Sequence, residues 1–311
     1  MLNFEDFSDE LVEALNAYYA GSYSVTIHKV QKNNGVELNG LTIAKNGESA
    51  GVTVYMEDFY EKYLMEQSMG QIVAYLVKLV PEYDLSGMNT DFLGDYKSVK
   101  SKLFFKLLNK EKNRKFMHES PYVEYLNLIL IPCCLIMQEN GECGLVQTRN
   151  VYLDTWGISE DQLIEDTWEN ARRISKCKFK SAMDIYMDYF KENLPKIPDV
   201  DTEAMAASMA SHFAAGNDFL IATNTMEFYG ASVIAFPENL EAISQKVGGS
   251  FLVLPCSVHE VIIRPVTGGI NSKEYSDMVK EVNRDALDRQ DVLSDSPYFY
   301  DARTKKLQLI Q

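Results

Sequence analysis

Cysteine and histidine are scarce in this sequence, and neither recurs at the spacing that a metal site needs. The 311 residues include five cysteines, an odd number at irregular spacing, and four histidines. No C-x-x-C pair is present, and the adjacent Cys133 and Cys134 lie within an apolar run, where we expect core residues. The sequence therefore predicts no disulfide framework, no metal and no cofactor, and it favours a reducing cytoplasm.

Long apolar runs and nucleotide-binding loops are also missing. The most apolar stretch, Leu126 to Met137, is interrupted by Asn127 and Pro132. It is about half as long as a bilayer-spanning helix. The loops G-x-x-x-x-G-K-S/T and G-x-G-x-x-G do not occur, nor does the G-x-S-x-G turn of serine hydrolases. The first residues are acidic where an export signal is basic, so we expect a soluble cytoplasmic protein that does not enter a membrane.

Positive charge is in deficit. The sequence has 30 lysines and arginines against 45 aspartates and glutamates, which gives a formal net charge of −15. Such a chain repels bare nucleic acid and anionic membranes, because both bind positive surfaces. The same charge favours solubility and suits a basic protein partner. Hydrophobic residues make up 46% of the chain, which is enough for a sizeable core.

Hydrophobic periodicity predicts both helices and hairpins along the chain. A helix over residues 4–20 precedes two strands, and Asn34-Gly35 between them predicts a type I′ turn, whose two central residues need positive φ. A third strand near residues 52–56 is followed by two helices, the second of which Pro81 stops. Further hairpins and helices follow the same pattern. We expect an α+β fold in which antiparallel or mixed sheets, built from hairpins, carry packed helices.

The best candidate for a domain boundary is the segment 194–202. It contains two prolines and shows no periodicity, which is typical of a linker. It would join an N-terminal α+β region, 1–195, to a C-terminal α+β region, 203–311. In the C-terminal region, residues 219–235 predict a hairpin, and Pro237 opens a helix behind it.

Residues 97–115 hold the strongest local charge anomaly. Seven lysines and one arginine lie there against a single acid, Glu111, and apolar residues interleave with them. One interpretation is an amphipathic element with a solvated basic face. The alternative is a surface that binds RNA or phosphate. Its candidate residues are Lys97, Lys100, Lys102, Lys106, Lys110, Lys112, Arg114 and Lys115.

Catalytic residue types gather in the segment 255–260 (PCSVHE). It follows a predicted buried strand, and such loops often display functional side chains. His259 would be a general base oriented by Asp295, and a thiol or hydroxyl just before it would be the nucleophile. The alternative is a turn held by hydrogen bonds of Ser257 and His259. The candidate catalytic residues are Cys256, Ser257, His259, Glu260 and Asp295.

Several phrases of the sequence together resemble a known family. They are KNNGV (32–36), FYEKY (59–63), WGI (156–158), LPCSVHEV (254–261), EVN (281–283) and LSD (293–295). The family they resemble is an uncharacterised one from gut anaerobic bacteria, a domain of unknown function, and the likeness runs along nearly the whole chain. That family more usually has Leu-Pro-Ser-Ser at 254–257, which implies that Cys256 is not an essential nucleophile. The resemblance implies a single full-length unit and leaves activity and cofactors open.

Three functions remain open. The first is a non-enzymatic interaction or regulatory protein of the bacterial cytoplasm, whose acid-rich faces at 5–13 and 160–169 would inhibit a basic nucleic-acid-binding partner. The second is a hydrolase centred on His259, Glu260 and Asp295, which requires that these side chains converge. The third is an RNA- or phosphate-binding protein that uses the basic stretch 97–115. The absence of catalytic motifs favours the first.

Overall fold

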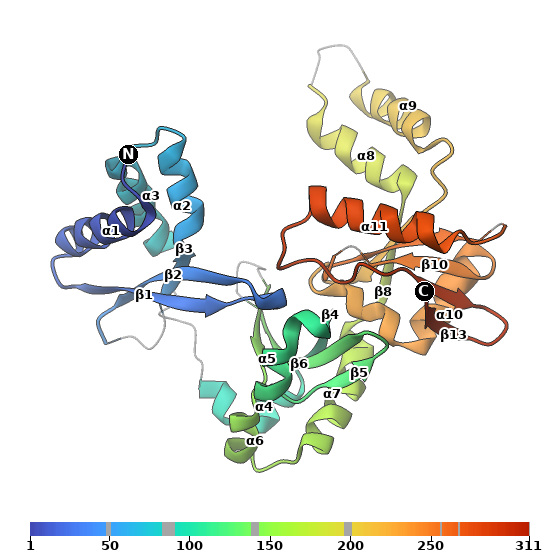
Figure 1. Ribbon diagram of the computed structural model, residues 1–311, viewed down its shortest axis with the longest axis horizontal. Helices are drawn as coiled ribbons and strands as arrows, with labels where there is room; N and C mark the ends of the chain where they lie inside the picture. Colours follow the sequence, from blue (N-terminus) through green and yellow to red (C-terminus); the bar gives the residue numbers. More distant parts are fainter. Residues whose placement is uncertain are drawn as a thin grey trace. The chain divides into compact units, whose positions relative to one another are not determined.

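The computed structural model describes residues 1–47, 51–82, 91–137, 143–195, 201–255, 257–266 and 268–310. These residues form an α+β fold with three antiparallel sheets, which confirms the expected fold class (Figure 1). The chain divides into two compact units, Met1–Leu93 (unit 1) and Gly94–Gln311 (unit 2). No helix in the described ranges combines the length and apolar character that a membrane crossing requires.

Unit 1 is a three-stranded sheet whose core-facing side is covered by helices. Its elements in chain order are α1 (Phe4–Tyr19), β1 (Tyr23–Gln31), η1 (Asn33–Gly35), β2 (Glu37–Lys45), β3 (Val52–Tyr55), α2 (Met56–Leu64) and α3 (Met69–Glu82). The strands pair in the order β1-β2-β3, so β1 is an edge strand. Asn34 and Gly35 have φ values of 59° and 70°, which confirms the turn that the sequence predicts between β1 and β2.

The core of unit 1 follows from two periodicities. Leu11 and Leu15 lie on one face of α1, and Leu41 and Ile43 alternate along β2, so all four point into the space between helices and sheet. Each of these side chains is at most 2% exposed. The other side of α1 carries its carboxylates and remains in water.

Unit 2 begins with a sheet built around one long apolar strand. After η2 (Asp91–Gly94), which spans the boundary between the units, its elements are α4 (Tyr96–Lys100), β4 (Leu103–Asn109), η3 (Glu111–Asn113), α5 (Arg114–Glu119), β5 (Val123–Tyr125), β6 (Leu128–Met137), β7 (Cys143–Gln147), α6 (Asn150–Trp156) and α7 (Glu160–Ile174). Strand β6 pairs with β4, β5 and β7. Cys133 and Cys134 are buried free thiols in β6, as expected, and burial raises the pKa of each to about 11.

The second sheet of unit 2 has six strands in the order β13-β12-β10-β11-β9-β8. Its elements are β8 (Cys177–Ser181), α8 (Ala182–Asn193), α9 (Thr202–Ala214), β9 (Leu220–Asn224), η4 (Gly230–Ala235), α10 (Pro237–Val247), β10 (Phe251–Leu254), β11 (Val261–Pro265), α11 (Ser272–Ala286), β12 (Tyr298–Asp301) and β13 (Lys306–Leu309). Buried residues of both sheets form one core, in which Trp168 of α7 lies between Phe105 of β4 and Phe236.

The division into units differs from the linker expected at 194–202. Strand β8, before this segment, pairs with β9, after it, and α8 packs against α9 through Phe190, Ala206 and Ala210. The two sides therefore share one sheet and one helical pair. Residues 196–200 themselves lie outside the described residues.

The hairpin expected over residues 219–235 is wrong in its second half. Residues 230–235 form the 3-10 helix η4, and β9 pairs with β8 and β11 instead. The chain reverses where Tyr229 has φ 48°, and a Cβ at Gly230 would overlap the Thr223 hydroxyl and lie 2.6 Å from the His259 carbonyl oxygen. Apolar composition alone could not reveal this close approach, because it depends on the loop that contains His259.

Candidate functional site

The segment around His259 runs beside the segment that leads to Asp295. Ser257 and Val292 form an antiparallel bridge, and the Val258 N–H donates to the Asp291 carbonyl oxygen at 2.8 Å. The Ser294 N–H donates to the Pro255 carbonyl oxygen at 3.2 Å. Cys256, a candidate nucleophile, lies outside the described residues.

Both ring nitrogens of His259 face protein groups. Nδ1 accepts the backbone N–H of Tyr229 at 3.3 Å, and Nε2 lies 3.7 Å from Oδ1 of Asp291. A neutral imidazole has one acceptor and one N–H donor. With Nδ1 as the acceptor, the proton is on Nε2 and faces Asp291. In this arrangement the ring has no lone pair left for a substrate, so a general base at His259 would need the Tyr229 contact to break.

The backbone of His259 is equally engaged. Its N–H donates to Oγ of Ser257 at 3.0 Å, and its carbonyl oxygen accepts the Thr223 hydroxyl at 2.8 Å. Ser257 therefore accepts a hydrogen bond within the turn. This agrees with the alternative interpretation of the sequence, a turn held by hydrogen bonds of Ser257 and His259. Glu260, next in the chain, has a raised pKa because neighbouring protein displaces water from its carboxyl group, while His259 and Lys180 counteract this rise.

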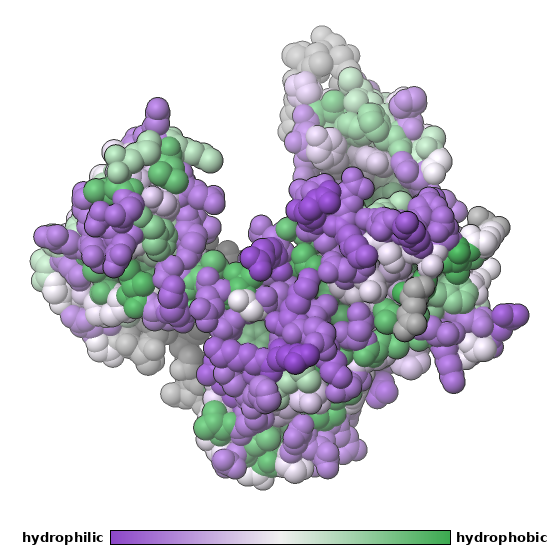
Figure 2. Space-filling view, in the orientation of Figure 1, coloured by the Kyte–Doolittle hydropathy of each residue, from purple (hydrophilic) through white to green (hydrophobic). Residues whose placement is uncertain are grey.

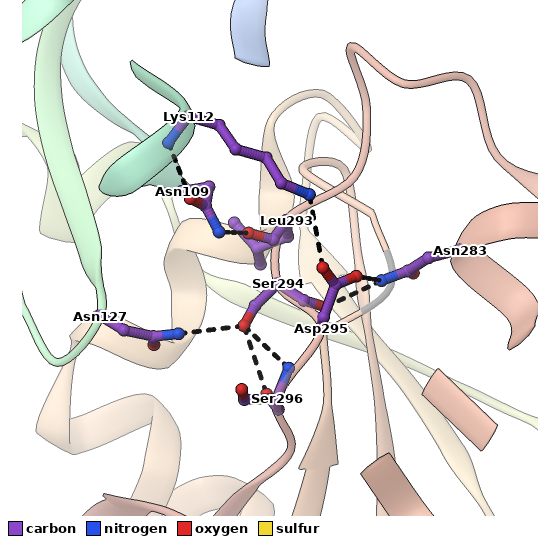
Figure 3. A network of polar contacts seen from close by, with 8 residues as sticks. All are labelled: Asn109, Lys112, Asn127, Asn283, Leu293, Ser294, Asp295 and Ser296. Carbon is purple, nitrogen blue, oxygen red and sulfur yellow. Dashed lines mark hydrogen bonds and ion pairs between the residues drawn. The ribbon is translucent and has the colours of Figure 1, made fainter. Parts of the chain in front are cut away.

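Asp295 points to other partners than His259 (Figure 3). Its Oδ1 accepts a hydrogen bond from Asn283 of α11 at 2.8 Å, and its Oδ2 lies 3.4 Å from Nζ of Lys112. The carboxylate that faces His259 is that of Asp291, which the sequence interpretation missed. Only a run of acids near a predicted loop could have suggested it, and the choice between two acids four residues apart depends on tertiary contacts.

The loop 293–296 is held by a network of amide side chains (Figure 3). Asn109 donates to the Leu293 carbonyl oxygen at 3.3 Å, and Asn127 donates to Oγ of the fully buried Ser294 at 3.2 Å. Asn283 also donates to the Ser294 carbonyl oxygen at 2.9 Å. The network joins the end of β4, the turn before β6 and α11. Its buried bonds favour a structural role for Leu293-Ser294-Asp295.

The basic stretch does not lie on one amphipathic element. Its residues are divided among α4, β4, η3, α5 and the turns between them, and the apolar residues between the lysines form the buried strand β4. Lys106 is itself buried in β4, with Nζ 4.7 Å from the centroid of the Phe116 ring. Lys97 and Lys102 lie on and just after α4, and Lys115 lies on α5.

At least four of the basic side chains form ion pairs with carboxylates in the described part of the chain. The Nζ atom of Lys100 is 2.8 Å from Asp166, and that of Lys110 is 2.7 Å from Glu124. Lys112 pairs with Asp295, and Arg114 pairs with Glu111. These acids come from α7, β5, the 293–296 loop and η3. A continuous basic track for a polyanion therefore lacks support in the described residues.

Two surface depressions are lined by both charged and apolar side chains. The first, which we call the acidic groove, lies between α1 and β1, encloses about 640 Å³ and is lined by Asp9, Val12, Glu13, Asn16, Ala17 and Ile27. The second, which we call the basic hollow, encloses about 290 Å³ and is lined by Lys110, Glu111, Arg114, Met117, His118 and Tyr122. No three His, Cys, Asp or Glu side chains in the described ranges are grouped so as to hold a metal ion.

The sequence predicted only some of the residues that line these depressions. The acidic face of α1 was visible as charges opposite the apolar positions, and Lys110 and Arg114 were candidates. Ile27 was missed as a partner in the groove, because it comes from β1 whereas the charges beside it come from α1. His118, on the same helix as Arg114, was predicted only as an isolated polar residue. Over α1 and β1, the face drawn in Figure 2 is mostly hydrophilic with small apolar areas between.

Fold and surfaces together define an α+β protein of two compact units with separate charged depressions. The chain belongs to a family of unknown function, DUF5688, whose model matches residues 4–302. This match confirms the resemblance to a domain of unknown function along nearly the whole chain. Neither a curated protein nor a solved structure matches the chain.

Proposed function

We propose that this protein is an interaction protein that binds a basic amphipathic helix of a protein partner in the acidic groove. The observation that carries the proposal is the spacing of the α1 residues in the groove. Asp9, Val12, Glu13, Asn16 and Ala17 stand at positions i, i+3, i+4, i+7 and i+8, which form one face of a helix. This face is not the one that carries Leu11 and Leu15 into the core, so it is open to a second helix.

The charges of the groove favour a basic occupant. Asp9 and Glu13 are exposed, and neither forms an ion pair within the described part of the chain. The second acid-rich face, on α7, is partly committed, because Asp166 there is buried against Lys100. Complementary charge at a rim mainly speeds encounter and selects the partner. The net charge of −15 acts in the same direction over longer distances.

The floor of the groove supplies apolar contact. Ile27 of the edge strand β1 is 39% exposed, and Val12 and Ala17 flank it. A helix that lies along α1 would bury these side chains with its apolar stripe and place flanking lysines opposite Asp9 and Glu13. This is the helix-in-groove mode of recognition. Because apolar area contributes about 25 cal/mol per Å², burial would add affinity that charge at a rim does not give.

A nucleic-acid-binding protein is the partner class that this chemistry fits, since such proteins carry basic helices. Occupation of the acidic groove would cover that helix and inhibit its binding to nucleic acid. We place this activity in the cytoplasm of a bacterium, where the buried free thiols Cys133 and Cys134 stay reduced.

The test uses the full chain and a fluorescent amphipathic peptide of lysine and leucine, with binding followed by anisotropy. The double substitution Asp9→Lys with Glu13→Lys reverses two charges, and we expect about tenfold weaker binding. Ile27→Thr keeps a β-branched residue in β1 and removes apolar area. We expect weaker binding, and the loss of affinity should be nearly the same at low and high salt concentration.

The matched control is Glu165→Lys with Glu169→Lys. These two acids are also exposed and four residues apart on a helix, α7, so the change in net charge is the same. A scrambled peptide of the same composition tests the apolar stripe. Equal losses from both double substitutions, or equal binding of the scrambled peptide, would show non-specific attraction and contradict the proposal.

A further inference from the structure

The basic hollow is a second depression, on unit 2, with a different chemistry from the acidic groove. Lys110 directly follows β4, and Glu111 is the first residue of η3. Arg114 and His118 lie four residues apart on α5, so their side chains share one face of this helix. Met117 and Tyr122 complete the lining. Nitrogen donors of three residue types thus surround a hollow that also has an apolar and an aromatic wall.

The backbone beneath the hollow is fixed before any ligand arrives. Asn109 accepts the Lys112 N–H through its side chain at 3.0 Å, and its carbonyl oxygen accepts a hydrogen bond from the buried Asn113 at 2.8 Å. The Lys110 N–H donates to the Asn127 carbonyl oxygen at 3.2 Å. Asn150 donates to the carbonyl oxygen of His118 at 3.0 Å. A preorganised frame lowers the entropy that binding costs.

Carboxylates already engage the two cations of the hollow. Arg114 donates from Nε and from Nη2 to the same oxygen of Glu111, and Nζ of Lys110 lies 2.7 Å from Glu124. The side chains of Arg114 and Glu111 are 72% and 67% exposed. Exposed ion pairs of this kind contribute little free energy, because water screens both charges. A ligand with more oxygens and more charge than a carboxylate can displace Glu111.

We propose that the basic hollow binds the phosphate group of a small phosphate monoester, with the body of the ligand against Tyr122 and Met117. A phosphate monoester has three acceptor oxygens and nearly two negative charges, which match the donors of Lys110, Arg114 and His118. A polyanion fits less well, because the chain as a whole carries a charge of −15 and repels it. The hollow of about 290 Å³ holds a phosphate together with a small organic group.

The ring signals of His118 provide a direct test in the full-length protein. Only four histidines are present, so their imidazole resonances can be assigned by comparison with His118→Gln. Phenyl phosphate and inorganic phosphate are titrated separately. We expect both to shift the His118 signals and phenyl phosphate to bind more tightly, because only phenyl phosphate has a ring that can contact Tyr122.

Substitutions then separate a site from general charge. Arg114→Gln removes two charge-assisted donors, and we expect about tenfold weaker binding of phenyl phosphate. Glu111→Gln removes the competing carboxylate, and we expect about threefold tighter binding. The second effect would not follow from a merely structural role of this ion pair.

Arg172→Gln is the matched control, since Arg172 forms the same kind of exposed pair with Glu238, at 3.2 Å, and does not line the hollow. It should leave the affinity unchanged. Unmoved His118 signals, equal weakening by Arg114→Gln and Arg172→Gln, or equal affinities for the two phosphates would overturn the proposal.

Discussion

Asp166 carries its charge where α7 meets α4. Its side chain is 4% exposed, and its two oxygens accept the Lys100 ammonium at 2.8 Å and the Tyr96 hydroxyl at 2.7 Å. Burial opposes ionisation of this carboxyl, but the hydrogen bonds from Lys100, Tyr96 and Gln162, together with the charge of Lys100, outweigh burial and lower the pKa of Asp166 below its ordinary value. Burial and then the bond to Asp166 raise the pKa of Tyr96. Asp166 belongs to the acid-rich face 160–169, which the sequence indicates to be solvated, but it joins α7 to α4 instead.

Replacement of Asp166 by Asn should lower the free energy of unfolding at neutral pH by about 1–2 kcal/mol. This is less than the cost of breaking a fully buried pair, because Lys100 is 47% exposed. The lowered pKa means that the unfolded state binds the proton more readily, so this stabilisation is complete above the unfolded pKa. It is lost as pH falls through the lower folded pKa, in a range below about pH 4.

Denaturant unfolding of wild type and Asp166→Asn at several pH values checks this. The difference in unfolding free energy between the two proteins should shrink as pH falls. Glu165→Gln and Glu169→Gln, on exposed neighbours of the same helix, should stay within about 0.5 kcal/mol of wild type. A difference that is constant with pH would show that Asp166 is not a stabilising charge.

Elements defined by local periodicity were predictable from the sequence. Helix α10 begins at Pro237 and ends at Val247, where Gly248 caps it in the left-handed region, and the β1–β2 turn follows from Asn34-Gly35. Strand β4 was missed, because Lys106 within it and the lysines on either side made a buried strand resemble part of a basic surface. The candidate site was predicted least well, since His259 meets Asp291 and Tyr229 only through pairing of distant segments.

The turn at Gly230 gives a test of that tertiary contact. Gly230→Ala places a methyl group against the Thr223 hydroxyl and backbone atoms of Asn224 and His259, which cannot move as a side-chain tip can. We expect a loss of about 3 kcal/mol, at the upper end of the cost of overpacking. The ring signals of His259 should also change, because its Nδ1 bonds to the residue before the glycine.

Gly268→Ala is the control for this substitution, since a Cβ there meets nothing within 4 Å. Its unfolding free energy, measured by denaturant, should remain within about 0.5 kcal/mol of wild type. Equal stability of the Gly230 and Gly268 variants would mean that the loop with His259 is looser than the structure describes.

At the scale of the whole molecule, the two units have separate cores. The buried cluster of unit 1, around Leu11 and Leu41, and the joint core of the two sheets in unit 2, around Leu107 and Ile263, have no residue in common among the described residues. The two proposed binding depressions also lie on different units. Stability and binding should therefore be separable by substitution.

Leu41→Ala and Leu107→Ala form a matched pair for this idea, because both leucines are fully buried in strands, β2 and β4. Each should destabilise its own unit by about 3 kcal/mol through the lost apolar contact and the cavity left behind. Hydrogen exchange with peptide resolution should show faster exchange in residues 1–47 for Leu41→Ala and in residues 103–137 for Leu107→Ala. If either substitution accelerated exchange equally in both units, the chain would unfold as one cooperative body, and an effect of Asp9 and Glu13 on binding would no longer be attributable to unit 1 alone.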